Sequence, residues 1–294
     1  MDIIGKLIDE KLITPPKWMK DNIQFATIFG SVAYGMSTDL SDMDIYAYCI
    51  PPKTYLFPHL AGYIDGFGTN PPHFDEFQQH HISYNDRSYD VKVFNIVKFF
   101  ELARLGNPNC VEILFTTQNC ILKQTVVGQL IRENRKLFLS KKCWPRFKGY
   151  AYSNIKFIND YKPQGKRMET IQKYGWDVKA GAHLLRLINE IEQILMYGDL
   201  DLTANADQLR QIRNGKFTAN EVMDIFNEKE KSLEKLYLES TLQNEANEEE
   251  IKQLLLKCLE MHYGSLNDAI IKQEKSIADI YKELGESLER KGIL

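Results

Sequence analysis

The segment Phe29-Gly-Ser-Val-Ala-Tyr-Gly35, followed shortly by Ser41-Asp-Met-Asp-Ile-Tyr46, decides the fold of this chain. A Gly-Ser turn follows one apolar run at residues 25–29. Two aspartates then stand one residue apart where a second apolar run begins. Successive side chains of a strand point to opposite faces, so Asp42 and Asp44 share a face. Adjacent carboxylates repel each other unless a cation lies between them, and hard oxygen ligands favour Mg²⁺ or Mn²⁺.

The Gly-Ser turn is typical of a phosphate-binding site. Gly30 allows the backbone to approach a ligand closely, and the Ser31 hydroxyl with the following backbone N–H groups can donate to phosphate oxygens. Residues 32–34 are expected to begin a helix whose N-terminus favours an anion. Ser41 is a further candidate for nucleotide binding, although its hydroxyl can instead brace the loop through nearby backbone groups.

A third carboxylate is expected from a neighbouring strand, because two-metal phosphoryl chemistry needs one. Asp90 fits this role, since Tyr89-Asp-Val-Lys-Val-Phe94 alternates like a strand and follows the turn-like Asn85-Asp-Arg-Ser88. Asp86 is the competing candidate. A long segment separates Asp44 from either residue.

Together these motifs resemble the DNA polymerase beta-type nucleotidyltransferase superfamily, whose signature is a Gly-Ser turn, an Asp-x-Asp pair and a distal Asp. The resemblance extends to a predicted nucleotidyltransferase family associated with RNA ligases (RlaP-like), over roughly residues 24–215. The stretches that carry it further are Gly35-Met-Ser-Thr-Asp-Leu-Ser-Asp-Met-Asp44, Gly106-Asn-Pro-Asn-Cys-Val-Glu-Ile-Leu-Phe115 and Tyr174-Gly-Trp-Asp-Val-Lys-Ala-Gly-Ala-His-Leu-Leu-Arg-Leu187.

The resemblance implies an α+β fold with a polymerase beta-type nucleotidyltransferase core, in which helices flank a small mixed sheet. An all-α helical domain is expected to follow. We place the catalytic domain at residues 1–125 and the helical domain at residues 126–294. All ten prolines lie at or before Pro163, and the sequence beyond them is strongly helix-like, with a capping-box pattern at Thr218-Ala-Asn-Glu221.

The resemblance also implies the site. Asp42, Asp44 and Asp90 would be the catalytic residues and would hold Mg²⁺ or Mn²⁺, with a nucleoside triphosphate as substrate. Lys179, His183 and Arg186 are four and three residues apart and so share a helix face on which phosphates can bind. The expected nucleotide-binding residues are Gly30, Ser31, Ser41, Lys173, Lys179, His183 and Arg186.

The predicted reaction is metal-dependent transfer of a nucleoside monophosphate from the triphosphate to an acceptor hydroxyl. The association with RNA ligases indicates an RNA 3′ end, such as that of a broken tRNA under repair. One alternative is nucleotidylation of a protein or tRNA in a toxin–antitoxin or phage-defence setting. Another is an inactive nucleotide-binding or RNA-binding module, although all three candidate carboxylates are present.

Composition and cysteine usage favour a cytoplasmic protein, and the resemblance implies the cytoplasm of a bacterium or of a phage-infected host cell. The 294 residues are 44% hydrophobic and 26% charged, which is ordinary for a soluble protein, and no apolar run approaches the length of a membrane span. The five cysteines are scattered, as expected for reduced thiols. Oligomeric state is not predicted.

Positive charge is concentrated in one part of the chain. Between Arg132 and Lys179 there are thirteen Lys or Arg residues and four acids. Within this part, residues 138–161 interleave aromatic and basic side chains, which suits RNA binding and a helical core with basic stems equally well. Residues 51–88, which are rich in Pro, Gly and aromatic residues, are expected to form a long connection or lid.

Overall fold

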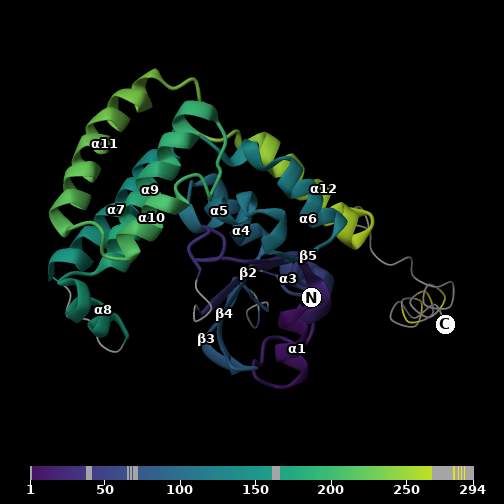
Figure 1. Cartoon of the computed structure of the whole chain (residues 1–294). Coiled ribbons are helices and arrows are strands. Elements are labelled where there is room, and N and C mark those ends of the chain that lie inside the picture. The colour runs from purple at the N-terminus through teal and green to yellow at the C-terminus, as the bar shows by residue number, and fades with distance from the viewer. Residues whose placement is uncertain are drawn as a thin grey trace. The chain divides into compact units, whose positions relative to one another are not determined.

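The structure is a computed structural model that describes residues 2–37, 42–64, 66, 68, 72–160, 166–266, 281, 284, 286 and 288. Within these ranges a single five-stranded mixed sheet forms the centre of the fold (Figure 1). Its strands are β1 (Ile23–Ile28), β2 (Met43–Cys49), β3 (Glu76–Tyr84), β4 (Arg87–Asn95) and β5 (Ile121–Gln124). The expected α+β class with a small mixed sheet is confirmed.

Helices precede the sheet, connect its strands and make up most of the chain after it. The α-helices are α1 (Ile3–Asp9), α2 (Met19–Asn22), α3 (Lys53–Leu56), α4 (Ile96–Arg104), α5 (Pro108–Phe115), α6 (Val126–Glu133), α7 (Cys143–Asp160), α8 (Lys166–Tyr174), α9 (Val178–Tyr197), α10 (Ala206–Arg213), α11 (Ala219–Glu239) and α12 (Glu248–Tyr263). The 3₁₀ helices are η1 (Pro58–Ala61), η2 (Gln118–Cys120) and η3 (Arg135–Phe138).

The strand order is β3-β4-β2-β1-β5. The central pair β2 and β4 is parallel, whereas the other neighbouring pairs are antiparallel. A parallel pair needs a long crossover, and the chain supplies it through α3, η1 and the hairpin partner β3. The register pairs Met43 and Asp44 at the start of β2 with Tyr89 and Asp90 near the start of β4, so these residues lie side by side at one end of the two strands.

The core of the sheet is aromatic. Phe25 stacks on Tyr48 with ring centroids 5.4 Å apart, and Tyr48 stacks on Phe99 of α4 at 4.5 Å. All three side chains are fully buried. The burial of three large rings between β1, β2 and α4 fixes the position of β2, which carries Asp44 close to its start.

Helix α9 is the centre of the helical part. Its N-cap Asp177 accepts a hydrogen bond from the Ala180 N–H at 2.9 Å, and it ends at Gly198 in the left-handed conformation. Helices α7, α10 and α11 pack against it (Figure 1). It is therefore buried over most of its surface, including polar residues that a surface helix would expose.

Two local expectations are corrected by the structure. Residues 51–88 are not one long connection, because β3 occupies residues 76–84. Residues 32–34 form an isolated turn and do not begin a helix. Helix α5 follows directly after α4, and its N-cap Asn107 and Pro108 at the first position favour a helix start.

The chain divides into two compact units. One contains residues 1–51 and 74–258, with the whole sheet and helices α4–α11, and the other contains residues 52–73 and 259–294. The division into domains at residue 125 stays a prediction. All five cysteines are buried free thiols. Across the residues that the structure describes, none of the helices combines the length and apolar character that a bilayer crossing requires.

Candidate functional site

The register of the two central strands brings two of the predicted carboxylates together. Asp44 of β2 is the direct partner of Asp90 in β4. Paired positions of adjacent strands have their Cα atoms about 4.8 Å apart and their side chains on the same face. Asp42 comes directly before β2, close enough for its carboxylate to raise the pKa of Asp44. The competing candidate, Asp86, lies in the hairpin turn between β3 and β4.

Gly30 lies against the Asp44 carboxylate. Its φ of +64° is in the left-handed region, and a Cβ at this position would stand 2.0 Å from Asp44 Oδ2. The Phe29 N–H donates to the Asp44 carbonyl oxygen at 2.7 Å, which fixes the turn to the start of β2. The Asp44 carboxylate therefore occupies the space that a side chain at position 30 would take.

This arrangement predicts a large cost for Gly30→Ala. Left-handed backbone costs an L-residue about 1–2 kcal/mol, and the clash with Asp44 adds to that cost. We expect a loss of about 3 kcal/mol in the free energy of unfolding, measured by urea denaturation. The matched control is Gly175→Ala, where φ is +80° but a Cβ meets no atom within 4 Å, so strain alone should remain. Equal losses in both variants would contradict the proposed contact.

The turn after Gly30 is closed by backbone hydrogen bonds. The Tyr34 N–H donates to the Gly30 carbonyl oxygen at 3.3 Å, and the Met36 N–H donates to that of Ser31 at 2.8 Å. The half-buried Ser31 hydroxyl has no hydrogen-bond partner among the described residues, which leaves it available to a ligand. Ser41, another predicted nucleotide-binding residue, lies outside the described residues.

The charge around Asp44 is only partly balanced. Burial raises the pKa of Asp44, and the Asp90 and Asp42 carboxylates raise it further, against opposing effects of Lys179 and His80. Its carboxylate has neither a hydrogen bond nor an ion pair with any residue that the structure describes. A half-buried carboxylate in this condition favours binding of a cation.

Asp90 is held from β3 by a bulge. The register between β3 and β4 shifts between Gln79 and Ile82, and His81 there has a φ of +55°. The shift places the His81 N–H 2.8 Å from Asp90 Oδ1 and the His80 Nδ1 2.9 Å from Asp90 Oδ2. Burial alone would raise the pKa of Asp90, but these two contacts outweigh burial and lower it. Bulges of this kind commonly re-aim side chains at functional sites.

The oxygen donors at this edge of the sheet suit an incompletely coordinated divalent cation. Among the described residues, no three Asp, Glu, His or Cys side chains converge into a ready-made metal site. Mg²⁺ is, however, usually held by one or two carboxylates together with waters and substrate phosphates. The unsatisfied Asp44 carboxylate beside Asp90, with Asp42 at the edge, fits that kind of site.

Helix α9 presents its predicted residues at different depths. Lys179 is exposed in the first turn, close enough to lower the pKa of Asp44, whereas His183 is half-buried. Arg186 is only 2% exposed and does not reach the surface on which a phosphate would bind. Lys173 of α8 lies with its ammonium 4.9 Å from the Tyr174 ring centroid and bonds none of the three aspartates in the described chain. The structure thus brings Lys179 to the carboxylates, but neither Arg186 nor Lys173.

Arg186 instead connects α9 to the Gly-Ser turn through a buried network. Its Nη1 lies 2.6 Å from Glu112 Oε2 and 3.0 Å from Glu190 Oε1, and its Nη2 lies 3.0 Å from His183 Nδ1. The Tyr34 hydroxyl donates to Glu112, and the Tyr34 ring packs 4.1 Å from the guanidinium. Burial raises the pKa of Glu190 well above its usual range, so this carboxyl holds its proton more tightly beside Glu112.

Two parts of this site were not predicted from the sequence. The contact of His80 with Asp90 depends on β3, and the one local signal for that strand was the Asn85-Asp86 pair. Both residues have positive φ, as in the two-residue turns that close hairpins. The pairing of Glu112 with Arg186 spans 74 positions, and no local pattern indicates it.

Comparison with known proteins finds similar sequences and structures, among them a phage protein and a solved bacterial protein. An "Uncharacterized 38.9 kDa protein in nrdC-mobD intergenic region" of Enterobacteria phage T4 is 24% identical over 168 residues, which are 56% of this chain and 43% of that protein. The chain thus spans less than half the length of that relative. A nucleotidyltransferase-like protein from Exiguobacterium sibiricum 255-15 is 12% identical, with 98% of this chain and 90% of that one covered at a TM-score of 0.30.

Residues 5–269 match a family described as the RNA repair pathway DNA polymerase beta family, RlaP. This match covers most of the chain, including the Gly-Ser turn, the paired aspartates and α9. The description of this family names an RNA repair pathway and the DNA polymerase beta type. The chain belongs to the RlaP family of polymerase beta-type proteins.

Proposed function

We propose that this protein transfers a nucleoside monophosphate from a nucleoside triphosphate to the 3′ hydroxyl of an RNA, such as a broken tRNA. The observation that carries the proposal is the pairing of Asp44 with Asp90 in register, with Gly30 closing against the Asp44 carboxylate. The RNA repair description of the family supports an RNA acceptor.

The chain's own residues divide the work of binding. The backbone after Gly30 and the free Ser31 hydroxyl would receive the triphosphate. Lys179 would offset part of the negative charge that the phosphates bring close to Asp44. His80 and the His81 N–H hold the Asp90 carboxylate in position on the same face. The Gly-Ser turn would be held in position by the buried network of Tyr34, Glu112 and Arg186.

Asp42, Asp44 and Asp90 would hold Mg²⁺ or Mn²⁺ with the phosphates. When bound, such an ion supplies Lewis-acid stabilisation of phosphoryl charge and lowers the pKa of a coordinated hydroxyl. In the reaction, the RNA 3′ oxygen forms a bond to the α-phosphorus and the bond from that phosphorus to the bridging oxygen breaks. Pyrophosphate leaves with the electron pair, and the hydroxyl proton passes to a base, for which Asp90 is the candidate.

The test is label transfer from each of the four α-labelled nucleoside triphosphates, together with pyrophosphate release. Total tRNA and other RNA serve as acceptors, with Mg²⁺ or Mn²⁺ present. Labelled RNA would support the proposal and identify the nucleotide. Label on a protein would replace it with the protein-modifying alternative. Triphosphate binding without pyrophosphate release in the presence of every acceptor would favour an inactive binding module.

Lys179 provides a prediction for triphosphate binding. Lys179→Met should raise the dissociation constant for the metal-bound triphosphate about tenfold, because a charged contact to a phosphate is lost. The side chain is exposed, so the free energy of unfolding should change little. Binding is measured by calorimetry, with Lys235→Met of α11 as the matched control, since its side chain is 76% exposed. Equal affinities for Lys179→Met and the wild type would remove Lys179 from the site.

A further inference from the structure

The basic and aromatic residues of α7 fall into two groups. Most are used inside the protein: Trp144 and Phe147 are buried, and Lys148 forms ion pairs with Glu230 at 2.9 Å and Glu234 at 3.1 Å. These contacts account for much of the pattern in residues 138–161 by packing and ion pairing. They do not account for the other side of the helix.

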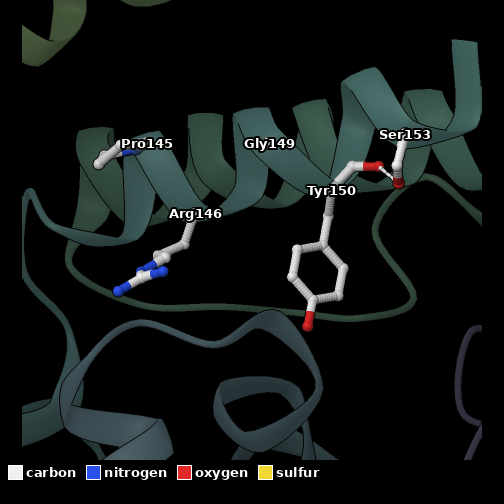
Figure 2. A pocket seen from close by; sticks show the side chains of 5 residues that line it. All are labelled: Pro145, Arg146, Gly149, Tyr150 and Ser153. Atoms are coloured by element: carbon white, nitrogen blue, oxygen red, sulfur yellow. Dashed lines mark hydrogen bonds between the residues drawn. The ribbon is translucent and has the colours of Figure 1, made fainter.

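That other side carries a surface pocket of about 380 Å³. Its lining residues all belong to α7 and are exposed: Pro145, Arg146, Gly149, Tyr150 and Ser153. Arg146 and Tyr150 are one helical turn apart and project from the same side of α7, with Gly149 between them (Figure 2). A Cβ added at Gly149 would meet no atom within 4 Å, so the floor of the pocket is open.

The charge of the pocket is not compensated. Residues 134–159 contain seven Lys or Arg residues and no Asp or Glu. Arg146 has no ion pair or hydrogen bond with any residue in the described ranges. Lys142 and Lys148, by contrast, each pair with a glutamate. A guanidinium in this condition favours a phosphate, which it can bind through two hydrogen bonds.

The aromatic member of the pocket is already ordered. The Tyr150 hydroxyl accepts a hydrogen bond from Asn107 Nδ2 at 3.1 Å, while 38% of the residue stays exposed. Its ring is therefore a fixed surface on which a base can stack at little entropic cost. The Ser153 hydroxyl donates to the Tyr150 carbonyl at 2.7 Å, so its oxygen remains able to accept a hydrogen bond.

We propose that this α7 pocket binds one nucleotide of single-stranded RNA, with its base on Tyr150 and its phosphate on Arg146. The identification of the polyanion as RNA rests on the proposed function, of which this pocket would be the acceptor-binding part. Single strands are favoured over duplexes, because the bases of a duplex are stacked on one another and their faces are not accessible to Tyr150.

The experiment measures binding of a fluorescent single-stranded RNA of about 12 nucleotides to the full chain by anisotropy. Arg146→Glu and Tyr150→Ala should each weaken binding about tenfold or more, and Tyr150→Phe should retain most of it because the ring remains. Arg146→Glu should also lower the salt dependence of log Kd by about 0.7. Gly149→Leu should block the pocket while keeping the fold, since leucine is the better helix former.

The control is Lys235→Glu, which makes the same change of net charge at an exposed position of α11. It should bind RNA within about twofold of the wild type. The proposal is overturned if Lys235→Glu weakens binding as much as Arg146→Glu, if Gly149→Leu binds normally, or if a duplex binds as tightly and is affected equally. Labelling of RNA by these variants at the wild-type rate and affinity would overturn the pocket but leave the proposed function intact. RNA binding that depends on the α7 pocket, without any nucleotidyl transfer, would overturn the proposed function but support the pocket.

Discussion

Replacing Asp44 by Asn is expected to abolish nucleotidyl transfer without unfolding the protein. Asp44 stands between Gly30 and Asp90, and its carboxylate has no hydrogen bond or ion pair within the described residues. The amide keeps the shape but not the charge on which cation binding depends. Because a bound metal contributes several kcal/mol of charge stabilisation, we expect the rate to fall about a thousandfold or more.

The same substitution should leave the thermal midpoint unchanged or raise it. The pKa of Asp44 is raised by burial and by the neighbouring carboxylates, so the folded protein binds this proton more tightly than the unfolded chain does. Ionisation of Asp44 therefore costs stability as the pH rises from about 4. The Asp44→Asn variant is free of that loss. Its thermal midpoint should therefore rise relative to that of the wild type between about pH 4 and pH 7, measured by calorimetry in EDTA.

The matched control is Asp86→Asn, which removes a carboxylate from the hairpin turn. Asn tolerates the φ of +58° found there, so the turn should persist. Transfer by this variant should equal that of the wild type. An active Asp44→Asn protein would contradict the assignment of the site, and an inactive Asp86→Asn protein with intact Asp90 would reopen the choice of the third carboxylate.

Replacing Arg186 by Met should produce the largest loss of stability. Arg186 is the cation that faces both Glu112 and Glu190, and all three side chains are at most 3% exposed. Removal of one partner from a buried ion pair leaves an uncompensated charge, which costs about 3–5 kcal/mol. The loss would appear as a lower urea midpoint with an unchanged slope.

Two comparisons separate this explanation from a simple loss of packing. In Arg186→Met with Glu112→Gln, the buried charge that lost its partner is also removed, so part of the stability should return. Lys179→Met, on the same helix but exposed, should change the free energy of unfolding by no more than about 0.5 kcal/mol. A loss below about 1 kcal/mol for Arg186→Met would show that the buried network does not hold α9 to the turn.

Local features of the site and fold were predictable from the sequence. The Asp-x-Asp spacing predicted that Asp42 and Asp44 share a face, and the alternation around Asp90 predicted a strand with a further carboxylate. The structure pairs Asp44 with Asp90. The capping box at Thr218 and Glu221 is confirmed in α11. The Asp-x-Asp spacing and the capping box depend on residues within a few positions of one another, where periodicity and capping rules apply. The third carboxylate is distant in sequence, and it was expected because two-metal phosphoryl chemistry needs one.

Features that depend on distant contacts could not be predicted. Strand β3 is an edge strand whose side chains are mostly exposed, so it lacks a strong hydrophobic alternation, and His80 was assigned with a loop. The spacing of Lys179, His183 and Arg186 correctly predicted one helix but not its burial. Arg186 faces Glu112 because α9 packs within the protein, which the period of a single helix does not show.

The central claim is that the Asp44 and Asp90 site adds a nucleotide to an RNA 3′ end. It is tested most directly with a single-stranded RNA that carries either a 3′ hydroxyl or a 3′ deoxy end, the preferred α-labelled triphosphate and Mg²⁺. Our account predicts that the wild type extends the hydroxyl-ended RNA, that the deoxy-ended RNA stays unlabelled, and that the Asp44→Asn variant labels neither. Labelling of the deoxy-ended RNA, or undiminished labelling by Asp44→Asn, would contradict it.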